Sequence, residues 1–179
     1  MALKPISPTD LKEVAPGIFY RQPGASGILM ADRTIVDFLK SAAARSPTRR
    51  ARVCAHESPQ ADQHDMLIAS RRDTYVAPHR HLNRSESFMI VEGEVDLLLF
   101  DEAGAVTGIV AMAAPGSARP FFYRMPVGRF HSLAIRSDVL VFLESTRGPF
   151  DPAQNENAAW APPPEREAEG RAFIAALLC

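Results

Sequence analysis

The spacing of apolar positions along the chain changes near residue 50. In residues 33–45, apolar side chains recur every three or four positions, which predicts an amphipathic helix. Thr34 and Asp37 have the spacing of a capping box at its start, and Ser46 with Pro47 predicts its end. From about Ala51 to Ser145 the apolar runs are short and are separated by Gly, Pro, Asp and Ser; they read "DMLIAS", "TYVAP", "SFMIV", "VDLLLF", "AVTGIVAMA", "FFYRMP", "FHSLAI" and "VLVFLES". Many short strands with no helix between them predict an all-β antiparallel sandwich or jelly-roll barrel.

This pattern divides the chain into three parts of one expected domain, residues 1–179. Residues 1–50 are expected to form an N-terminal arm, with short strands or extended chain up to about residue 30, followed by the helix. Residues 51–146 are expected to form the barrel, with hairpin turns at "VEGEV" and "FDEAGAV" and with "VDLLLF" buried on both faces. Residues 147–179 carry five prolines and predict a surface arm that ends in a short helix, which Gly170 weakens.

Composition and charge exclude several classes of protein. The net charge of −1 gives no reason to expect a nucleic-acid partner or an anionic membrane surface. No run of about 18 apolar residues is present, and "MALKPISPTDLKEV" lacks the apolar core of a signal peptide. Cys54 and Cys179 lie far apart without a CxxC motif, so a reduced, cytoplasmic protein is expected, with Cys54 as a small buried residue.

The stretch "PHRHLNRSESFMIVEGEV" carries the first candidate chemistry. His79 and His81 point to the same face if they lie on a strand, about 7 Å apart along the backbone. Glu86 follows after a turn-rich segment and can return an oxygen to the same point from the neighbouring strand. Gly93 lies where that strand must turn and where a Cβ could obstruct it.

A second stretch, "RMPVGRFHSLAI", brings another histidine into the predicted barrel. Pro126 and Gly128 predict a tight turn, and His131 follows with Leu133 and Ile135 on its face. A lone histidine in such a setting is more often a hydrogen-bonded core residue than a ligand. The combination of all four candidate ligands, His79, His81, Glu86 and His131, in an all-β pattern predicts a divalent metal site.

These two stretches resemble the two motifs of the cupin superfamily, G(x)5HxH(x)3–4E(x)6G and G(x)5PxG(x)2H(x)3N. The resemblance implies metal binding at the same four residues. The chain departs from the motifs at Asp73, Pro120 and Ile135, which replace two glycines and the closing asparagine and touch turns rather than ligands. The segments "SPTRRAR", "YVAPHRH", "ESF", "EGEVDLLLFDEAG", "RSD" and "GPFDP" are similar to WbuC-type cupin-fold metalloproteins, over roughly residues 35–164. That family occurs among genes for O-antigen and surface-polysaccharide synthesis.

Three imidazoles and a carboxylate suit Fe, Mn, Ni or Zn, and the ligand set alone does not choose among them. Four protein ligands leave coordination positions for a small substrate with neighbouring oxygens. Around the predicted site we expect Tyr75 and Glu144 as catalytic groups and Tyr123, Arg124 and His56 as substrate-binding groups. Barrel packing or surface exposure is the alternative for each of them. For His56 and the nearby His64, a surface or hydrogen-bonded role is an equally good interpretation.

Two functions follow as hypotheses. The first is a metalloenzyme of the isomerase, epimerase or dioxygenase type that acts on a small sugar-derived or carboxylated substrate in surface-polysaccharide metabolism. The alternative is a non-catalytic module that binds a metal and a sugar. The doubly apolar strands and the N-terminal arm also make a homodimer an expectation.

Overall fold

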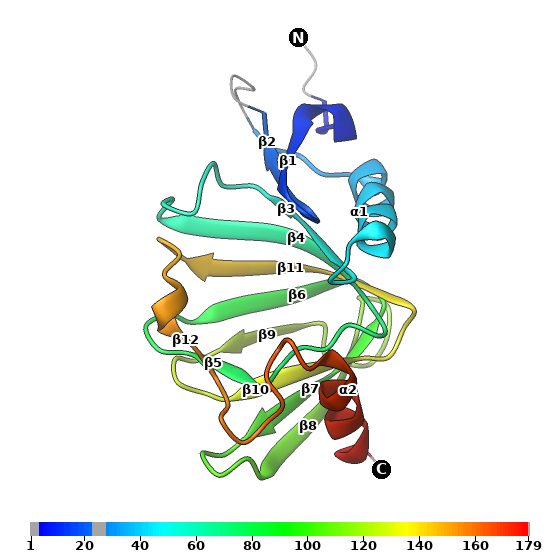
Figure 1. The fold of residues 1–179 in the computed structure, drawn as a ribbon. Helices are drawn as coiled ribbons and strands as arrows, with labels where there is room; N and C mark the ends of the chain where they lie inside the picture. The colour runs from blue at the N-terminus through cyan, green and yellow to red at the C-terminus, as the bar shows by residue number, and fades with distance from the viewer. Residues whose placement is uncertain (1–3, 23–27, 179) are drawn as a thin grey trace.

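Two β-sheets face each other and enclose the main core (Figure 1). The computed structural model describes residues 4–22 and 28–178, so Cys179 and part of the expected N-terminal arm lie outside the described residues. The larger sheet has the strand order β1-β2-β3-β4-β11-β6-β9, and the smaller has the order β12-β5-β10-β7-β8. Every strand pair in these two sheets is antiparallel except β2 with β3, as expected for an all-β jelly-roll sandwich.

The strands of the larger sheet come from distant parts of the chain. They are β1 (Leu11–Ala15), β2 (Ile18–Arg21), β3 (Arg50–Cys54), β4 (Gln63–Arg71), β6 (Glu86–Glu92), β9 (Phe122–Met125) and β11 (Val139–Arg147). The smaller sheet contains β5 (His79–His81), β7 (Glu94–Phe100), β8 (Val106–Ala113), β10 (His131–Ile135) and β12 (Asn155–Asn157). Two 3-10 turns, Pro8–Asp10 and Pro152–Gln154, precede β1 and β12.

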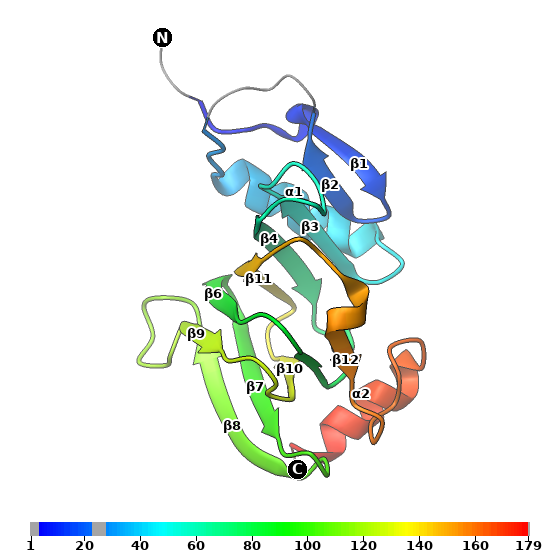
Figure 2. The same ribbon diagram turned by 90° about the vertical axis from the view of Figure 1, so that its left-hand side faces the viewer.

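Each sheet is also covered on its outer face, which explains the doubly apolar strands. Helix α1 (Arg33–Arg45) packs on the larger sheet, and α2 (Glu167–Ala176) packs on the smaller one, as Figures 1 and 2 show. In β7, Leu97 belongs to the core between the sheets, whereas Leu98 belongs to the cluster under α2. Because successive residues of a strand point to opposite faces, this strand is buried on both sides, as its sequence predicted.

Several local predictions are confirmed. The helix at residues 33–45 has the predicted bounds, and Cys54 is fully buried. The hairpin at Gly93 is also present: its φ is +98°, and an added Cβ would lie 2.6 Å from the carbonyl oxygen of Val139. A side chain at this position would therefore strain the backbone and collide with it, which explains the glycine.

Three local predictions are wrong. The helix N-cap is Asp32, whose carboxylate accepts a hydrogen bond from the Thr34 amide, so Thr34 and Asp37 form no capping box. The "TYVAP" strand is absent, because β5 begins only at His79. The C-terminal arm is more than a surface segment, because it adds β12 to the smaller sheet and packs Trp160 against Phe100.

Candidate metal centre

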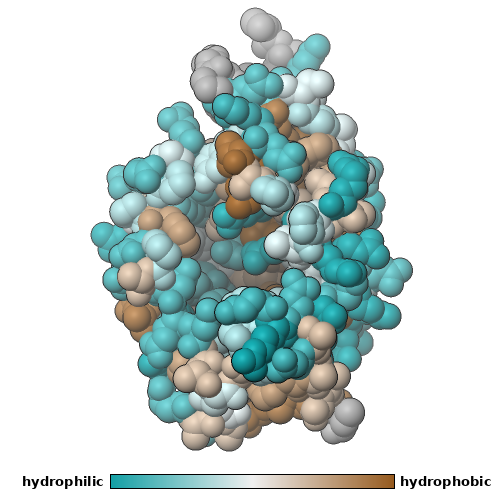
Figure 3. All heavy atoms as spheres, in the orientation of Figure 1, coloured by the Kyte–Doolittle hydropathy of each residue, from teal (hydrophilic) through white to brown (hydrophobic). Residues whose placement is uncertain are grey.

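A cavity of about 310 Å³ lies between the two sheets, and the predicted metal ligands line it. The view in Figure 3 shows a hollow near the middle of this face, with mostly hydrophilic residues around it. Its inner walls include the apolar side chains Phe88, Leu133, Ile135 and Phe142. Such a volume with a few converging polar groups is typical of a small-molecule site.

Three strands, β5, β6 and β10, bring the histidines and the glutamate together. His79 and His81 lie two residues apart on β5, so both face the cavity, while Arg80 between them faces outward over the Phe130 ring. Antiparallel pairing places His131 of β10 directly opposite His79. The ligand nitrogens of the three histidines all lie within 4.8 Å of one another.

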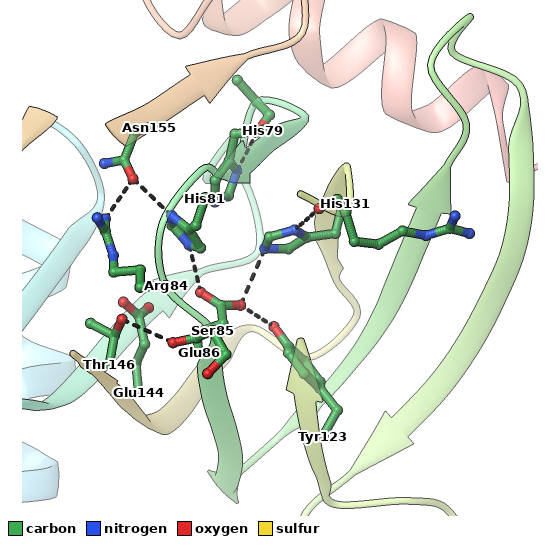
Figure 4. Close-up of polar contacts among 12 residues, drawn as sticks. His79, His81, Arg84, Ser85, Glu86, Tyr123, His131, Glu144, Thr146 and Asn155 are labelled. Carbon is green, nitrogen blue, oxygen red and sulfur yellow. Dashed lines mark hydrogen bonds and ion pairs between the residues drawn. The ribbon is translucent and has the colours of Figure 1, made fainter. Parts of the chain in front are cut away.

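Glu86 points into this cluster from the start of β6 (Figure 4). Its Oε2 lies 2.9 Å from His81 Nε2, and its Oε1 lies 3.2 Å from His131 Nε2. The hydroxyl of Tyr123 donates a hydrogen bond to Oε1 at 2.9 Å. The three histidines therefore form one cluster, and Glu86 contacts two of them, although His131 lies far from the other three residues in the sequence.

Hydrogen bonds fix which nitrogen of each ring faces the centre. His79 Nδ1 donates to the carbonyl of Ala77, and His131 Nδ1 donates to the carbonyl of Arg129, each at 2.9 Å. A carbonyl oxygen can only accept, so both rings carry their proton on Nδ1 and present Nε2 to the cavity.

The third ring, His81, is held in the same way by Asn155 of β12. Asn155 Oδ1 accepts a hydrogen bond from Arg84 Nη2 at 2.5 Å, and because arginine can only donate, this contact fixes the orientation of the amide. His81 Nδ1, 2.7 Å from the same oxygen, must therefore donate to it. All three histidines thus offer Nε2 to one point and donate through Nδ1, the arrangement usual for metal-bound imidazoles.

The protonation states of the cluster suit a cation. Burial and the neighbouring His131 lower the pKa of His79 to about 4, so this ring is neutral at pH 7, as a ligand must be. Burial opposes ionisation of Glu86, but hydrogen bonds with His131 and His81 outweigh it and hold the pKa of the carboxyl well below its usual value. With Nδ1 already protonated on His81 and His131, a close contact between Nε2 and a carboxylate needs a further positive charge, either a second proton or a metal ion. The residues present therefore fit a divalent metal.

Of the other predicted site residues, Tyr123, His56 and Glu144 line the cavity. Burial and the charge of Glu86 raise the pKa of Tyr123 well above its usual value, so its hydroxyl remains a donor. The His56 ring stacks on His64 with 4.0 Å between centroids. Glu144 points inward from β11, two residues before Thr146, and burial followed by the charge of Glu86 raises the pKa of its carboxyl.

Tyr75 and Arg124 are corrections to the sequence prediction. Tyr75 lies under α2, its hydroxyl donates to the carbonyl of Pro162 at 2.6 Å, and it does not line the cavity, because the chain before β5 is not a regular strand. Arg124 is exposed and donates to Ser85, because it follows the inward-facing Tyr123 on β9 and so points to the opposite face.

Arg50, Arg52, Arg84 and Asn155 also line the cavity and were not predicted from the sequence. Arg50 and Arg52 have the same i, i+2 spacing as the two histidines, which was the available signal. Nothing in the local sequence indicated Arg84 or Asn155, which meet across 71 residues of chain.

Comparisons with known proteins found similarities of sequence and of fold. Residues 31–112 match a family model described as a "Domain of unknown function (DUF6016)", a range that includes His79, His81 and Glu86 but ends before His131. A search of curated proteins found no significant match. No helix among the described residues is both long and apolar enough to cross a membrane.

Three similar solved structures illustrate the structural neighbours. A conserved protein with a double-stranded β-helix domain from Klebsiella pneumoniae is 15% identical, with a TM-score of 0.45 over 61% of this chain and 84% of that one. A sugar phosphate isomerase of the cupin superfamily from Silicibacter pomeroyi is 19% identical, with a TM-score of 0.43 over 55% and 59% of the two chains. The capsular polysaccharide assembling protein CapF from Staphylococcus aureus is 17% identical, with a TM-score of 0.46 over 60% of this chain and 29% of CapF.

Proposed function

We propose that the protein binds one divalent metal ion through His79, His81, Glu86 and His131, and that this centre acts on a small oxygen-rich molecule in the cavity. The single observation that carries the proposal is the common orientation of the three imidazoles. Each ring donates Nδ1–H to a fixed acceptor and presents Nε2 to a shared point beside a buried carboxylate. A structural core would have no need to converge three such rings, because buried histidines can be satisfied singly.

A bound ion of this kind supplies Lewis acidity, which polarises a carbonyl or lowers the pKa of a hydroxyl. Around it the protein's own groups have separate tasks. Tyr123 orients Glu86 through its hydrogen bond, and the apolar side chains of Phe88 and Leu133 limit the access of water. Glu144 is the titratable group of the cavity that we assign to proton transfer, because its raised pKa brings it closer to neutral pH.

We further propose a sugar-derived or carboxylated substrate and an isomerase, epimerase or dioxygenase type of reaction, with Fe, Mn, Ni or Zn as the ion. The resemblance to WbuC-type proteins supports a place in surface-polysaccharide metabolism. The two distant cysteines, which form no CxxC motif, support a cytoplasmic location. The alternative is a non-catalytic module that binds the metal and a sugar. A role of Glu144 in proton transfer would distinguish the enzyme from this module, because a binding module needs no proton transfer.

Metal content tests the ligand set directly. We expect His81→Ala to lose most of the metal found in the wild-type protein by elemental analysis while retaining its β-sheet circular dichroism. His56→Ala is the matched control, because His56 lines the same cavity outside the cluster. A full complement of metal in His81→Ala would refute the proposed centre.

Substrate class is tested by titrating metal-loaded and metal-stripped protein with hexose phosphates, nucleotide sugars and 2-oxo acids. Tighter binding to the metal-loaded form supports the proposal, and equal affinity of both forms contradicts it. Where a compound is turned over, Glu144→Gln should abolish turnover without loss of metal. Binding without turnover for every compound would favour the non-catalytic module.

A further inference from the structure

The cavity has a second polar end, made of arginines. Arg50, Arg52 and Arg84 line it together with the histidine cluster, and the described lining holds four arginines in all against two glutamates, Glu86 and Glu144. This excess of positive charge lies in a partly enclosed space, where charges interact more strongly than they do in water.

Arg84 is the most deeply placed of the three, at 7% exposed. Its Nη2 donates to Asn155, but its Nη1 is buried without a hydrogen-bond partner, and no carboxylate forms an ion pair with it among the residues described. Its guanidinium carbon lies over the Phe150 ring, 5.9 Å from the ring centre. A buried guanidinium without a carboxylate in direct contact is costly, so an anion in the adjoining cavity would stabilise it.

Arg50 and Arg52 reach the same cavity from β3. They alternate with Ala51 and Val53, which pack outward under α1, so both arginines face inward. Arg50 has one distant partner, Glu144 at 3.6 Å, and Arg52 contacts the sulfur of Met66 at 3.9 Å. The Nε atoms of both are buried without a partner, like Nη1 of Arg84.

The arginine end and the histidine end meet at Asn155. Its Oδ1 accepts hydrogen bonds from both Arg84 and His81, and Figure 4 shows Arg84 and His131 on opposite sides of His81. A ligand in this cavity can therefore touch the histidine cluster with one end and the arginines with the other.

We propose that Arg84, with Arg50 and Arg52, forms an oxyanion subsite that binds the carboxylate or phosphate group of the ligand beside the histidine cluster. The inference builds on the proposed function, since it names the chemical class of the ligand, but the subsite itself does not need the ion. Guanidinium groups suit this task because their planar array of donors matches the oxygens of carboxylate and phosphate.

The test uses inorganic phosphate and succinate as probes, titrated calorimetrically into metal-stripped and metal-loaded protein. We expect saturable binding of at least one probe in both forms, and a loss of about tenfold or more in affinity for Arg84→Gln, as expected for removal of a charge-assisted hydrogen bond. Arg52→Gln should weaken the same binding by a smaller factor. Because Arg52 is only half-buried, the affinity of this variant tests the subsite if Arg84→Gln does not fold. The probe that binds better identifies which oxyanion the subsite prefers.

Arg124→Gln is the matched control, because it removes the same charge from an exposed site outside the cavity and should leave the affinity within about twofold of wild type. Wild-type affinity in the foldable arginine variants, or binding only in the metal-loaded form, would overturn the subsite. Reduced metal content in Arg84→Gln with unchanged probe affinity would also overturn it, because Arg84 would then act only through Asn155. A different result is that the protein binds no metal at the four residues but still binds a probe in a way that depends on Arg84. That result would refute the proposed function and leave the subsite standing.

Discussion

Asn155 offers the sharpest test of how the fold prepares the metal centre. Its Oδ1 accepts the Nδ1–H of His81 and so holds the Nε2 of that ring toward Glu86. Replacing Asn155 with Ala removes this acceptor and leaves the ring free to rotate or to change tautomer. Loss of such a supporting hydrogen bond typically lowers metal affinity 10- to 100-fold, or about 1.4–2.7 kcal/mol.

The same substitution has a separate effect on stability, because Arg84 Nη2 loses its acceptor in a buried position. An unsatisfied buried donor costs about 1–3 kcal/mol, so the free energy of unfolding of the metal-free protein should fall by a similar amount. Asn155→Asp keeps an oxygen at the same position and adds a charge beside Arg84. It should therefore restore both the metal affinity and the stability.

The assay is competition for Zn²⁺ between the protein and a fluorescent chelator, with urea unfolding of the metal-free protein alongside. Asn157→Ala is the control. Asn157 lies two residues after Asn155 on β12 and lines the same cavity, but among the described contacts its side chain makes no hydrogen bond to a histidine of the cluster. Wild-type Zn²⁺ affinity in a folded Asn155→Ala protein would refute the idea that Asn155 prepares His81 for the ion.

Two further predictions concern stability. Gly93→Ala should destabilise the protein by about 1–3 kcal/mol in urea unfolding, because the residue has a φ of +98° and an added Cβ would collide with the Val139 carbonyl. Gly108→Ala is the control: its added Cβ would make only an ordinary contact, at 3.7 Å, and should have little effect. Equal stability of the two variants would contradict this reasoning. Burial and the neighbouring His64 lower the pKa of His56 from 6.5 to about 4. Between these two pH values the folded state binds fewer protons than the unfolded state, so the free energy of unfolding should fall as the pH drops from about 6.5 to about 4. His56→Gln should make the urea midpoint less dependent on pH within this window, and an unchanged dependence would show that His56 does not contribute to it.

Local pattern determined much of the fold. The bounds of helix α1 were predicted because its apolar spacing and its end at Ser46 are properties of adjacent positions, although its N-cap, Asp32, was not predicted. Burial of β7 on both faces followed from its unbroken apolar run. The failures occurred where tertiary contacts decide: residues 74–78 leave the strand conformation as Tyr75 packs beneath α2, and the Pro-rich arm pairs with β5. Neither partner is visible in the local sequence.

The candidate metal centre divides in the same way. The i, i+2 spacing of His79 and His81 places both on one face of a strand, and two short motifs predicted Glu86 and His131 as further ligands. The sequence by itself therefore determined which groups could bind a metal. Only the tertiary structure decided how they are held and what surrounds them. Asn155 and Arg84 reach the centre from segments 71 residues apart, and Arg124 faces away because of the register of β9. The physical reason is that strand periodicity is local, whereas hydrogen-bond partners and the charge of a cavity depend on which distant strands pair.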